Sequence, residues 1–497
     1  MRRKVVVIGS GFAGLSAATH LAKKGADVTI LEKNDQPGGR ARSFSTEGFT
    51  YDMGPSWYWM PDVFEKYFAH FGKSVSDYYE LQRLDPSYRV YFGQQDYVDL
   101  PATLEEVFKI FDSIEKGSGE KLRKFLSESA YKYQVGINDL VYKPGRSLME
   151  FADTRILMGL LQLDLLKSMR NYVHANFKNE RLCAIMEFPI LFLGGTPQDT
   201  PALYSLMNYA DMALGTWYPK GGMHKIVEGM VALAKEEGVQ IILKQEVKSI
   251  VMDGKKAVAV ETADKRYPCD VVVAGADYHH VEQHLLPEKC RQYSEAYWRK
   301  RKMAPSSLLY YMGIETKVEG LLHHNLFFDK NFDQHAKEIY TSPKWPSDPL
   351  FYVSAPSKTD VTVAPAGKEN LFMLMPVAPG LDDDEFTREK YFDLLINRLE
   401  KNIGSYVEPH ISVKQAYAHA DFIKDYHAYR GNAYGLANTL KQTAYLKPSL
   451  KSKKVKNLYY TGQLTVPGPG VPPALISGHV VASEIEKDFK HLNAFAL

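Results

Sequence analysis

The chain has 497 residues, which is enough for about three domain-sized units with a large apolar interior. Its 61 lysines and arginines nearly balance 59 aspartates and glutamates, so no overall positive field selects nucleic acid as a partner. Three cysteines without a C-x-x-C pair exclude a disulfide framework and a thiolate metal site, and they favour the reducing cytoplasm. No stretch reaches the about 18 apolar residues needed to cross a bilayer, so we expect peripheral membrane contact at most.

The N-terminal segment, residues 4–33, has the pattern of a strand, a helix and a second strand. A β-branched run at residues 5–8 predicts a strand buried on both faces of a parallel sheet. Three glycines follow with the G-x-G-x-x-G spacing, which permits a tight turn, close approach of a pyrophosphate and close packing of helix on strand. The predicted dinucleotide contacts in this turn are Gly9, Gly11, Phe12, Ala13 and Gly14. The alternative is a glycine-rich turn in another kind of α/β protein.

The second predicted strand, residues 28–31, ends at Glu32 and Lys33. An acid at this position accepts hydrogen bonds from the ribose hydroxyls of an adenosine and disfavours a 2′-phosphate. A glycine-rich turn without a dinucleotide leaves Glu32 unexplained. The sequence therefore predicts that Glu32 and Lys33 bind the adenosine end of the cofactor.

The segment 37–42 reads PGGRAR and follows the acid within about one turn. An acid followed by GGR after such a strand resembles the flavoprotein group that contains amine oxidases, protoporphyrinogen oxidase and carotenoid desaturases. The resemblance implies that Gly39 and Arg40 lie against the pyrophosphate of FAD, a use that suits the guanidinium fork. The alternative is a solvent-exposed arginine in a glycine turn.

Residues 49–60 read FTYDMGPSWYWM and resemble the segment that passes beside the isoalloxazine ring in this flavoprotein group. The resemblance implies cofactor contacts from Gly54, Pro55 and Ser56. Trp57 and Trp59 follow the rigid Gly-Pro pair and suit the lining of an apolar substrate channel. An aromatic cluster is as often plain core, so both interpretations stay open.

From about residue 78 to residue 214 the pattern is mainly helical. Apolar residues recur at helical spacing from Leu163 to Phe177, and the opposite stripe is basic, with Lys167, Arg170, His174, Lys178 and Arg181. Such a helix lies on an anionic bilayer or, more commonly, packs on a core with a solvated basic face. The run 299–302, RKRK, is a second basic surface. The uncharged segment 188–195 contains Phe188 and Phe192, which are further candidates for the channel wall.

Residues 216–290 resemble the return of the chain to the FAD domain. We expect a helix to about residue 235, after Trp217, another candidate for the channel wall. Strands are predicted at 239–243, 247–251, 258–261 and 270–274. In the resembling family the backbone at the position of Val247 contacts adenine, and an ordinary buried valine is a compatible interpretation. Alternation at 308–313 and 371–375 predicts a second sheet that walls the substrate site.

The C-terminal segment, residues 458–473, reads LYYTGQLTVPGPGVPP and predicts a buried strand, a fixed loop and a helix from about residue 474 to 487. In the resembling flavoproteins this helix directs its positive end at the flavin N1–C2=O edge. The resemblance implies contacts from Gly462, Val471 and Pro472. The loop has no cysteine, so we expect FAD to be bound noncovalently.

These elements predict an α/β fold in which a Rossmann-type FAD-binding domain is interrupted by an inserted α+β substrate domain. We assign residues 1–77, 215–290 and 451–497 to the FAD-binding domain. Residues 78–214 are expected to form a mainly helical substrate and membrane region, and residues 291–450 a substrate-binding region with the second sheet.

The motifs YPKGGM, GPSWYWMP and GPGVPPALISG together resemble bacterial carotenoid desaturases over nearly the whole chain. The resemblance implies hydride transfer to FAD from an allylic CH2–CH2 of an apolar polyene, in a phytoene-type or a 3,4-desaturation. Only one dinucleotide fingerprint is present, so electrons enter from the substrate and leave to oxygen or a quinone. No metal-ligand set is evident, and the catalytic acid or base is not assigned. We expect the pairs 279–280 and 323–324 to be surface or loop histidines.

Three other functions fit parts of the sequence. An amine oxidase shares the cofactor half but needs a small amine pocket, and a polyene isomerase needs reduced flavin and gives no net oxidation. A non-catalytic carrier similar to Rab GDP-dissociation inhibitors has the same architecture, but an intact flavin-ring loop disfavours it.

Overall fold

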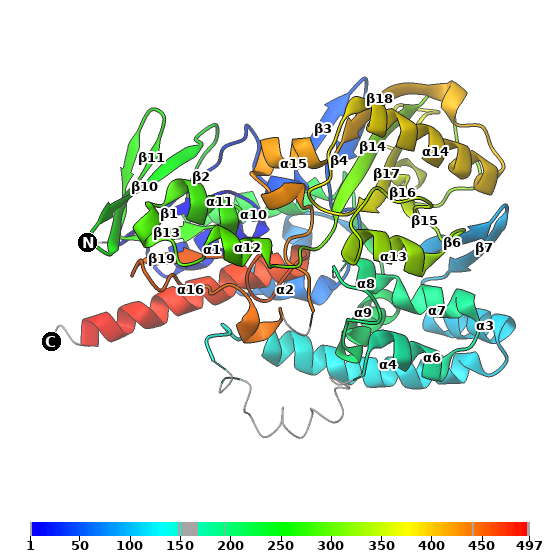
Figure 1. The fold of residues 1–497 in the computed structure, drawn as a ribbon, viewed down its shortest axis with the longest axis horizontal. Helices are drawn as coiled ribbons and strands as arrows, with labels where there is room; N and C mark the ends of the chain where they lie inside the picture. The colour runs from blue at the N-terminus through cyan, green and yellow to red at the C-terminus, as the bar shows by residue number, and fades with distance from the viewer. Residues whose placement is uncertain (1, 148–149, 151–166, 193, 440–441, 495–497) are drawn as a thin grey trace.

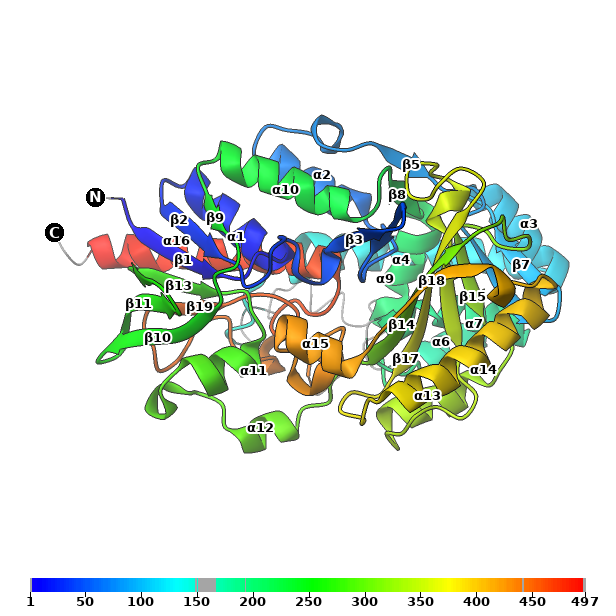
Figure 2. The ribbon, with the colours of Figure 1, turned by 90° about the horizontal axis from the view of Figure 1, so that it is seen from above.

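The structure is a computed structural model that describes residues 2–147, 150, 167–192, 194–439 and 442–494. Two sheets lie at opposite ends of the molecule, with helices packed outside them and long connections between them (Figure 2). Each sheet collects strands from distant parts of the chain. The site described below lies between these two sheets.

The first sheet has five parallel strands in the order β19-β13-β1-β2-β9. Its central strands are fully buried β-branched runs, as a parallel sheet covered on both faces requires. The strands predicted near residues 5–8, 28–31, 239–243 and 270–274 are confirmed here. The bounds are β1 Lys4–Ile8, β2 Asp27–Leu31, β9 Gln240–Ile242, β13 Val271–Ala274 and β19 Leu458–Tyr460.

Three helices pack on this sheet, α1 (Phe12–Lys23), α10 (His224–Glu236) and α16 (Val471–Ala494). Figure 1 shows α16 as the long red helix that runs beside the sheet. Helix α1 is buried along nearly its whole length between its neighbours. Its approach to α16 depends on Gly478, where a Cβ atom would lie 2.4 Å from the Ala13 carbonyl oxygen.

The second sheet has seven strands in the order β18-β14-β17-β16-β15-β6-β7. The strands predicted at 308–313 and 371–375 are confirmed as β14 and β17, which pair antiparallel with Leu308 opposite Met375. Alternate residues of β14 pack into two different cores, one facing the first sheet and one under α14 (Glu385–Ile403). The bounds are β6 Tyr88–Gly93, β7 Asp96–Leu100, β14 Ser306–Ile314, β15 His324–Phe327, β16 Phe351–Ser354, β17 Glu369–Val377 and β18 Ile411–Tyr417.

The region expected to be mainly helical from residue 78 begins instead with strands. β5 (Leu81–Arg83) pairs with β8 (Trp217–Pro219), and the β6–β7 hairpin completes the second sheet through parallel pairing of β6 with β15. Tyr88, Val90 and Tyr91 are buried there. The β6 and β7 segments are short. They become the edge of the second sheet because β6 pairs with β15, which lies more than 230 residues further along the chain.

Helices then cover the lower side of the second sheet (Figure 1). They are α3 Leu104–Ile114, α4 Ser118–Val135, α6 Met169–Asn176, α7 Glu180–Glu187, α8 Pro189–Phe192 and α9 Leu206–Asn208. The remaining helices and strands are α2 Pro61–Ala69, α11 Tyr278–His280, α12 Glu295–Arg299, α13 Phe332–Tyr340, α15 His419–Tyr426, β3 Ser43–Thr46, β4 Phe49–Asp52, β10 Val247–Asp253, β11 Lys256–Thr262 and β12 Arg266–Pro268. No helix in the described ranges is long and apolar enough to cross a membrane.

The amphipathic helix expected over 163–181 has a different structure. Leu163 and Leu166 lie outside the described residues, and α6 ends at Asn176 because Asn179 caps a new helix, α7. The apolar side is core, since Met169, Val173 and Phe177 are fully buried.

Basic side chains of this segment also form ion pairs within the protein. Arg170 pairs with Glu187 at 2.8 Å and with Asp333 at 2.6 Å, and Arg181 pairs with Asp96 at 2.5 Å. The prediction that this stripe contacts a bilayer is therefore wrong, because its apolar face packs into the protein.

We predict that Gly478→Ala separates α16 from α1, since its Cβ would meet the Ala13 carbonyl and the Ser16 side chain. Overpacking of this kind costs about 1–3 kcal/mol. Thermal denaturation should show a lower melting temperature and less bound FAD. Ser483→Ala in the same helix is the control, and equal melting temperatures for the two variants would contradict the close-approach argument.

Candidate cofactor and substrate site

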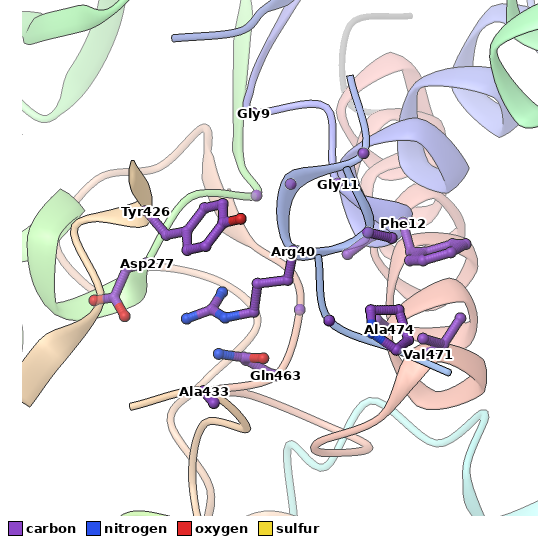
Figure 3. Close-up of a pocket in the computed structure, with 18 of the residues that line it drawn as sticks. Gly9, Gly11, Phe12, Arg40, Asp277, Tyr426, Ala433, Gln463, Val471 and Ala474 are labelled. Atoms are coloured by element: carbon purple, nitrogen blue, oxygen red, sulfur yellow. The ribbon is translucent and has the colours of Figure 1, made fainter. Parts of the chain in front are cut away.

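A cavity of about 380 Å³ lies between the two sheets. One side is the turn after β1 and the start of α1, and the other includes Leu309 of β14, Tyr352 of β16 and Leu374 of β17. Figure 3 shows the turn, the start of α16 and several polar side chains converging on this space.

All but one of the predicted cofactor residues line the cavity. They are Gly9, Gly11, Phe12, Ala13, Glu32, Lys33, Gly39, Arg40, Gly54, Pro55, Ser56, Val247, Gly462, Val471 and Pro472. The exception is Gly14, where a Cβ atom would lie 2.1 Å from the Gly9 carbonyl oxygen. Gly14 therefore permits the packing of α1 on β1 and does not face the cavity.

The glycine turn has the shape of a phosphate cradle. Gly9 adopts φ 93°, a left-handed conformation that favours glycine. At Gly11 an added Cβ would meet no atom within 4 Å, so the backbone is open toward the cavity. Helix α1 has no side-chain cap and no acid in its first turn, which leaves its N–H groups available to an anion.

Glu32 is held in one orientation by its neighbours. One carboxylate oxygen accepts from the backbone N–H and hydroxyl of Ser10 at 2.8 and 2.7 Å, and the other accepts from the Asn34 N–H at 2.9 Å. The side chain is 4% exposed, at the cavity wall. The remaining acceptor capacity of this carboxylate fits ribose hydroxyls.

Arg40 is the clearest sign of an anion site. Protein encloses its guanidinium, and this burial lowers the pKa of Arg40 from its ordinary value. One guanidinium nitrogen donates to the Asn432 carbonyl at 3.1 Å, but Nε has no partner and no carboxylate pairs with it among the described residues. The group lies between Tyr426, Asp277 and Gln463 in Figure 3. Arg42, two residues on, instead pairs with Asp425 at 2.5 Å.

The C-terminal loop closes the other side of the cavity. Gly462 adopts φ 107°, and its N–H donates to the Ser477 hydroxyl at 3.0 Å. Val471, Pro472 and the first turn of α16 then face the cavity, so the positive end of this helix points into it. The sequence prediction of a helix pointing here is confirmed, although α16 begins three residues earlier than expected.

The predicted channel residues divide into two groups. Trp57 and Trp59 line the cavity, and Phe188 packs behind them with ring centroids 6.1 and 6.2 Å away, outside the lining. Trp217 lies in β8, where its indole N–H donates to the Leu214 carbonyl at 2.9 Å and Arg83 lies over its ring, also outside the lining. The Phe192 side chain lies outside the described residues.

The histidine pair 323–324, expected at the surface or in a loop, is buried. His323 does lie in the connection before β15 but is only 3% exposed, and His324 is 0% exposed because it belongs to β15, an inner strand of the second sheet. His324 stacks on Trp57 with ring centroids 4.1 Å apart. In the other pair, His279 bonds Glu295 at 2.9 Å, and His280 lines the cavity and stacks on His427 at 3.9 Å.

Several lining residues carry no local sequence signal. The polar ones include Gln245, Glu246, Asp277, His280, Ser307, Tyr352, Asp425, Tyr426, His427, Tyr434 and Gln463. Asp277 follows the predicted strand 270–274 directly, so its position at the carboxyl end of a parallel strand was the one available clue. In the described part of the chain no group of three or more His, Cys, Asp or Glu is placed to hold a metal ion.

A parallel sheet with this glycine turn, an acid fixed at the end of β2 and an arginine without an acidic partner define a dinucleotide-dependent oxidoreductase of the Rossmann class. Residues 12–486 match the family of flavin containing amine oxidoreductases, and the chain belongs to that family. The cofactor is accordingly FAD. The open backbone at Gly11 and the guanidinium of Arg40 fit its pyrophosphate.

Relatives match along nearly the entire chain. A carotenoid 3,4-desaturase of Haloarcula japonica is 44% identical over 487 residues, which are 97% of this chain and 98% of the relative. A zeta-carotene-forming phytoene desaturase of Myxococcus xanthus is 32% identical over 490 residues, 97% of this chain and 94% of that protein. A 4,4′-diapophytoene desaturase of Staphylococcus aureus is also 32% identical, covering 98% of this chain and 99% of its own length.

Solved structures show the same fold at low identity. An oxidoreductase from Methanosarcina mazei has a TM-score of 0.62 at 16% identity and covers 97% of this chain and 100% of its own. A putrescine oxidase (TM-score 0.60, 12% identity) and a fatty acid isomerase from P. acnes (0.62, 14%) each cover 98% of this chain and 99% and 98% of their own.

We predict that Arg40→Ala weakens FAD binding about 10- to 100-fold, the value of a charge-assisted hydrogen bond to an anion. Arg42→Ala should weaken it less, because Arg42 is already paired with Asp425. The measurement is titration of the apoprotein with FAD. Acid precipitation should release the flavin from the parent, as expected of a noncovalent cofactor. Equal losses of affinity in both variants would contradict the assignment of Arg40.

Proposed function

We propose that this protein is a carotenoid desaturase that introduces a double bond into a long acyclic or monocyclic carotenoid, by phytoene-type or 3,4-desaturation. The observation that carries the proposal is the 44% identity to a carotenoid 3,4-desaturase over 98% of that protein. The cavity supports it, because beyond the cofactor turn its lining is apolar, with Trp57, Trp59, Met60, Met207, Leu309 and Leu374. A hydrocarbon chain needs such a lining.

When bound, FAD supplies the two-electron acceptor for a hydride leaving the substrate. The protein's own part is binding and orientation: Arg40 and the glycine turn would hold the pyrophosphate, and the side chains of Trp57 and Trp59 would fix the substrate against the opposite sheet. Exclusion of water and correct placement of the CH2–CH2 group supply much of the rate.

The other functions differ in measurable outcomes. An amine oxidase consumes amines, an isomerase changes the substrate without loss of mass, and a carrier leaves the flavin unreduced. The likeness to a putrescine oxidase and a fatty acid isomerase is one of fold, at 12% and 14% identity.

We predict net oxidation. Anaerobic incubation with carotenoids in liposomes should bleach the flavin, and the product should lose two hydrogens and absorb at longer wavelength. The measurements are mass spectrometry and absorbance spectra over a panel of acyclic and monocyclic carotenoids. Oxygen and a quinone should each be tested as the final acceptor. An isomer of unchanged mass, or reduction of flavin by amines alone, would overturn the proposal.

The proposal requires access to a substrate that dissolves in membranes, and we assign peripheral attachment to a surface around the basic run 299–302. Lys302 N–H donates to the Gln442 side chain at 2.9 Å, and the Gln442 amide donates back to the Lys302 carbonyl at 2.8 Å. Gln442 is followed three and four residues later by Tyr445 and Leu446, which are 40% and 37% exposed. Basic and exposed apolar side chains together suit an anionic bilayer.

We predict that Arg299→Glu combined with Lys300→Glu reduces co-sedimentation with anionic liposomes about tenfold or more, since each basic side chain near the surface contributes about 1 kcal/mol. High salt should weaken binding of the parent. FAD content should stay unchanged. The matched control reverses Lys255 and Lys256, which are exposed in the β10–β11 hairpin. If both double variants sediment alike, the attachment surface lies elsewhere.

A further inference from the structure

A polar pair interrupts the apolar wall of the cavity. Tyr352, in β16, lines the cavity, and its hydroxyl lies 2.6 Å from Nδ1 of His324 in the neighbouring strand β15. The strand register fixes the pair, because Leu326 opposes Tyr352 and His324 lies two residues before Leu326 on the same face. Trp57 and Leu374 beside the tyrosine ring are apolar, and the side chains of Ser56 and Ser354 reach its hydroxyl.

His324 is built to remain neutral and available. It is fully buried and stacked on Trp57 with an interplanar angle of 11°, and Nε2 has no hydrogen-bond partner. Burial, with a smaller contribution from His323, holds the pKa of His324 well below its usual range. Burial also raises the pKa of Tyr352 above its usual value. The resting pair is therefore a phenol bonded to a neutral imidazole.

A hydrocarbon substrate offers this pair nothing to hydrogen-bond, so substrate binding does not account for it. The proposed reaction does release a proton, because one hydrogen of CH2–CH2 leaves with its electron pair to FAD and the other leaves without electrons. The electron pair of the second C–H bond becomes the new π bond.

We propose, resting on the function proposed above, that the Tyr352 hydroxyl oxygen receives this proton while its own proton passes to Nδ1 of His324. Tyr352 then touches the reacting atoms and is a catalytic residue. His324 acts through Tyr352 and is a positioning residue that holds the phenolic proton only transiently, because its low pKa disfavours the charged imidazolium.

A polar route leads away from the pair. Ser56 contacts the Tyr352 hydroxyl and borders both the main cavity and a second one of about 20 Å³, large enough for one water. Tyr51, Asp52 and His323 line the second cavity, and the Tyr51 hydroxyl has no partner. Burial raises the pKa of Asp52 to about 6, which suits a group that takes up and releases a proton near neutrality.

The test is the Tyr352→Phe substitution, which removes only the hydroxyl oxygen of the tyrosine. Tyr352→Phe should slow anaerobic flavin reduction by saturating carotenoid about 100-fold, the lower range for general acid–base catalysis. FAD content, melting temperature and the affinity of the apoprotein for carotenoid should remain unchanged. The parent should show a solvent deuterium isotope effect on reduction, carried by the phenolic proton, and the variant should lose it. In the apoprotein, the imidazole ¹⁵N signals of His324 should shift in Tyr352→Phe.

The controls separate this proposal from a structural effect and from the proposed function. Tyr310→Phe is matched, since Tyr310 is a buried tyrosine of the same sheet whose hydroxyl donates to the Arg388 carbonyl in the other core. It should leave reduction unaltered. An active parent with an equally active Tyr352→Phe variant overturns the proton role alone. A parent that carotenoids do not reduce overturns both proposals. A loss confined to hydroxylated carotenoids also overturns the proton role, because the pair would then recognise a substrate hydroxyl.

Discussion

A buried guanidinium that no carboxylate of the described residues contacts directly is the constraint on which the rest of this structure depends. Burial of a guanidinium group is costly unless a partner is present, and Arg40 is met by the Asn432 carbonyl, the Tyr426 ring and the Gln463 side chain, with no carboxylate of the described residues in ion-pair contact. Arg42, two residues further on, pairs with Asp425, so acidic side chains are present in this region even though none contacts Arg40 directly. The pyrophosphate of FAD, which we propose lies here, would supply the balancing negative charge. The folded protein should therefore be less stable without FAD than with it, because cofactor binding contributes to the free energy of unfolding.

Two glycines, Gly14 and Gly478, set the positions of helices α1 and α16 relative to Arg40. Gly14 brings α1 onto β1, Gly478 brings α16 onto α1, and the two helix N-termini consequently reach the same cavity. The second sheet then has to face the turn at a distance set by the cofactor. Its strands β14 and β17 present Leu309 and Leu374 to the cavity, and their alternate residues, among them Met373, pack into the opposite core. One sheet therefore serves as a cavity wall and as the support of α14 at once.

The two ends of the chain were predictable because backbone rules decide them. Positive φ angles at Gly9 and Gly462, and a Gly-Pro loop before a helix, are local requirements that sequence spacing shows directly. The residues that form the substrate side of the cavity were less predictable. Trp217 is held by the pairing of β8 with β5, and Trp57 by stacking on His324, which are contacts that local sequence does not show. His324 itself looks like a surface residue until β15 is placed inside a seven-stranded sheet. The stripe at 167–181 failed for the same reason, since its acidic partners Glu187 and Asp333 come from other elements.

The part of the site that sequence predicts well is the part that binds the cofactor. The part that it predicts poorly, the cavity wall on the second sheet, is the part that selects the substrate. A putrescine oxidase and a fatty acid isomerase share this fold at 12% and 14% identity, so a common turn and helix serve quite different substrates. What differs must lie in the residues that the second sheet and the 54–60 segment turn toward the cofactor. In this chain those residues are apolar except at Tyr352, Ser56 and Ser307. A wall that is almost wholly apolar retains a hydrocarbon by exclusion of water and leaves it free to slide. The few polar groups on such a wall mark fixed positions along the substrate chain. In the proposed reaction the Tyr352 hydroxyl, bonded to the buried His324, is the one that selects a single CH2–CH2 group among many.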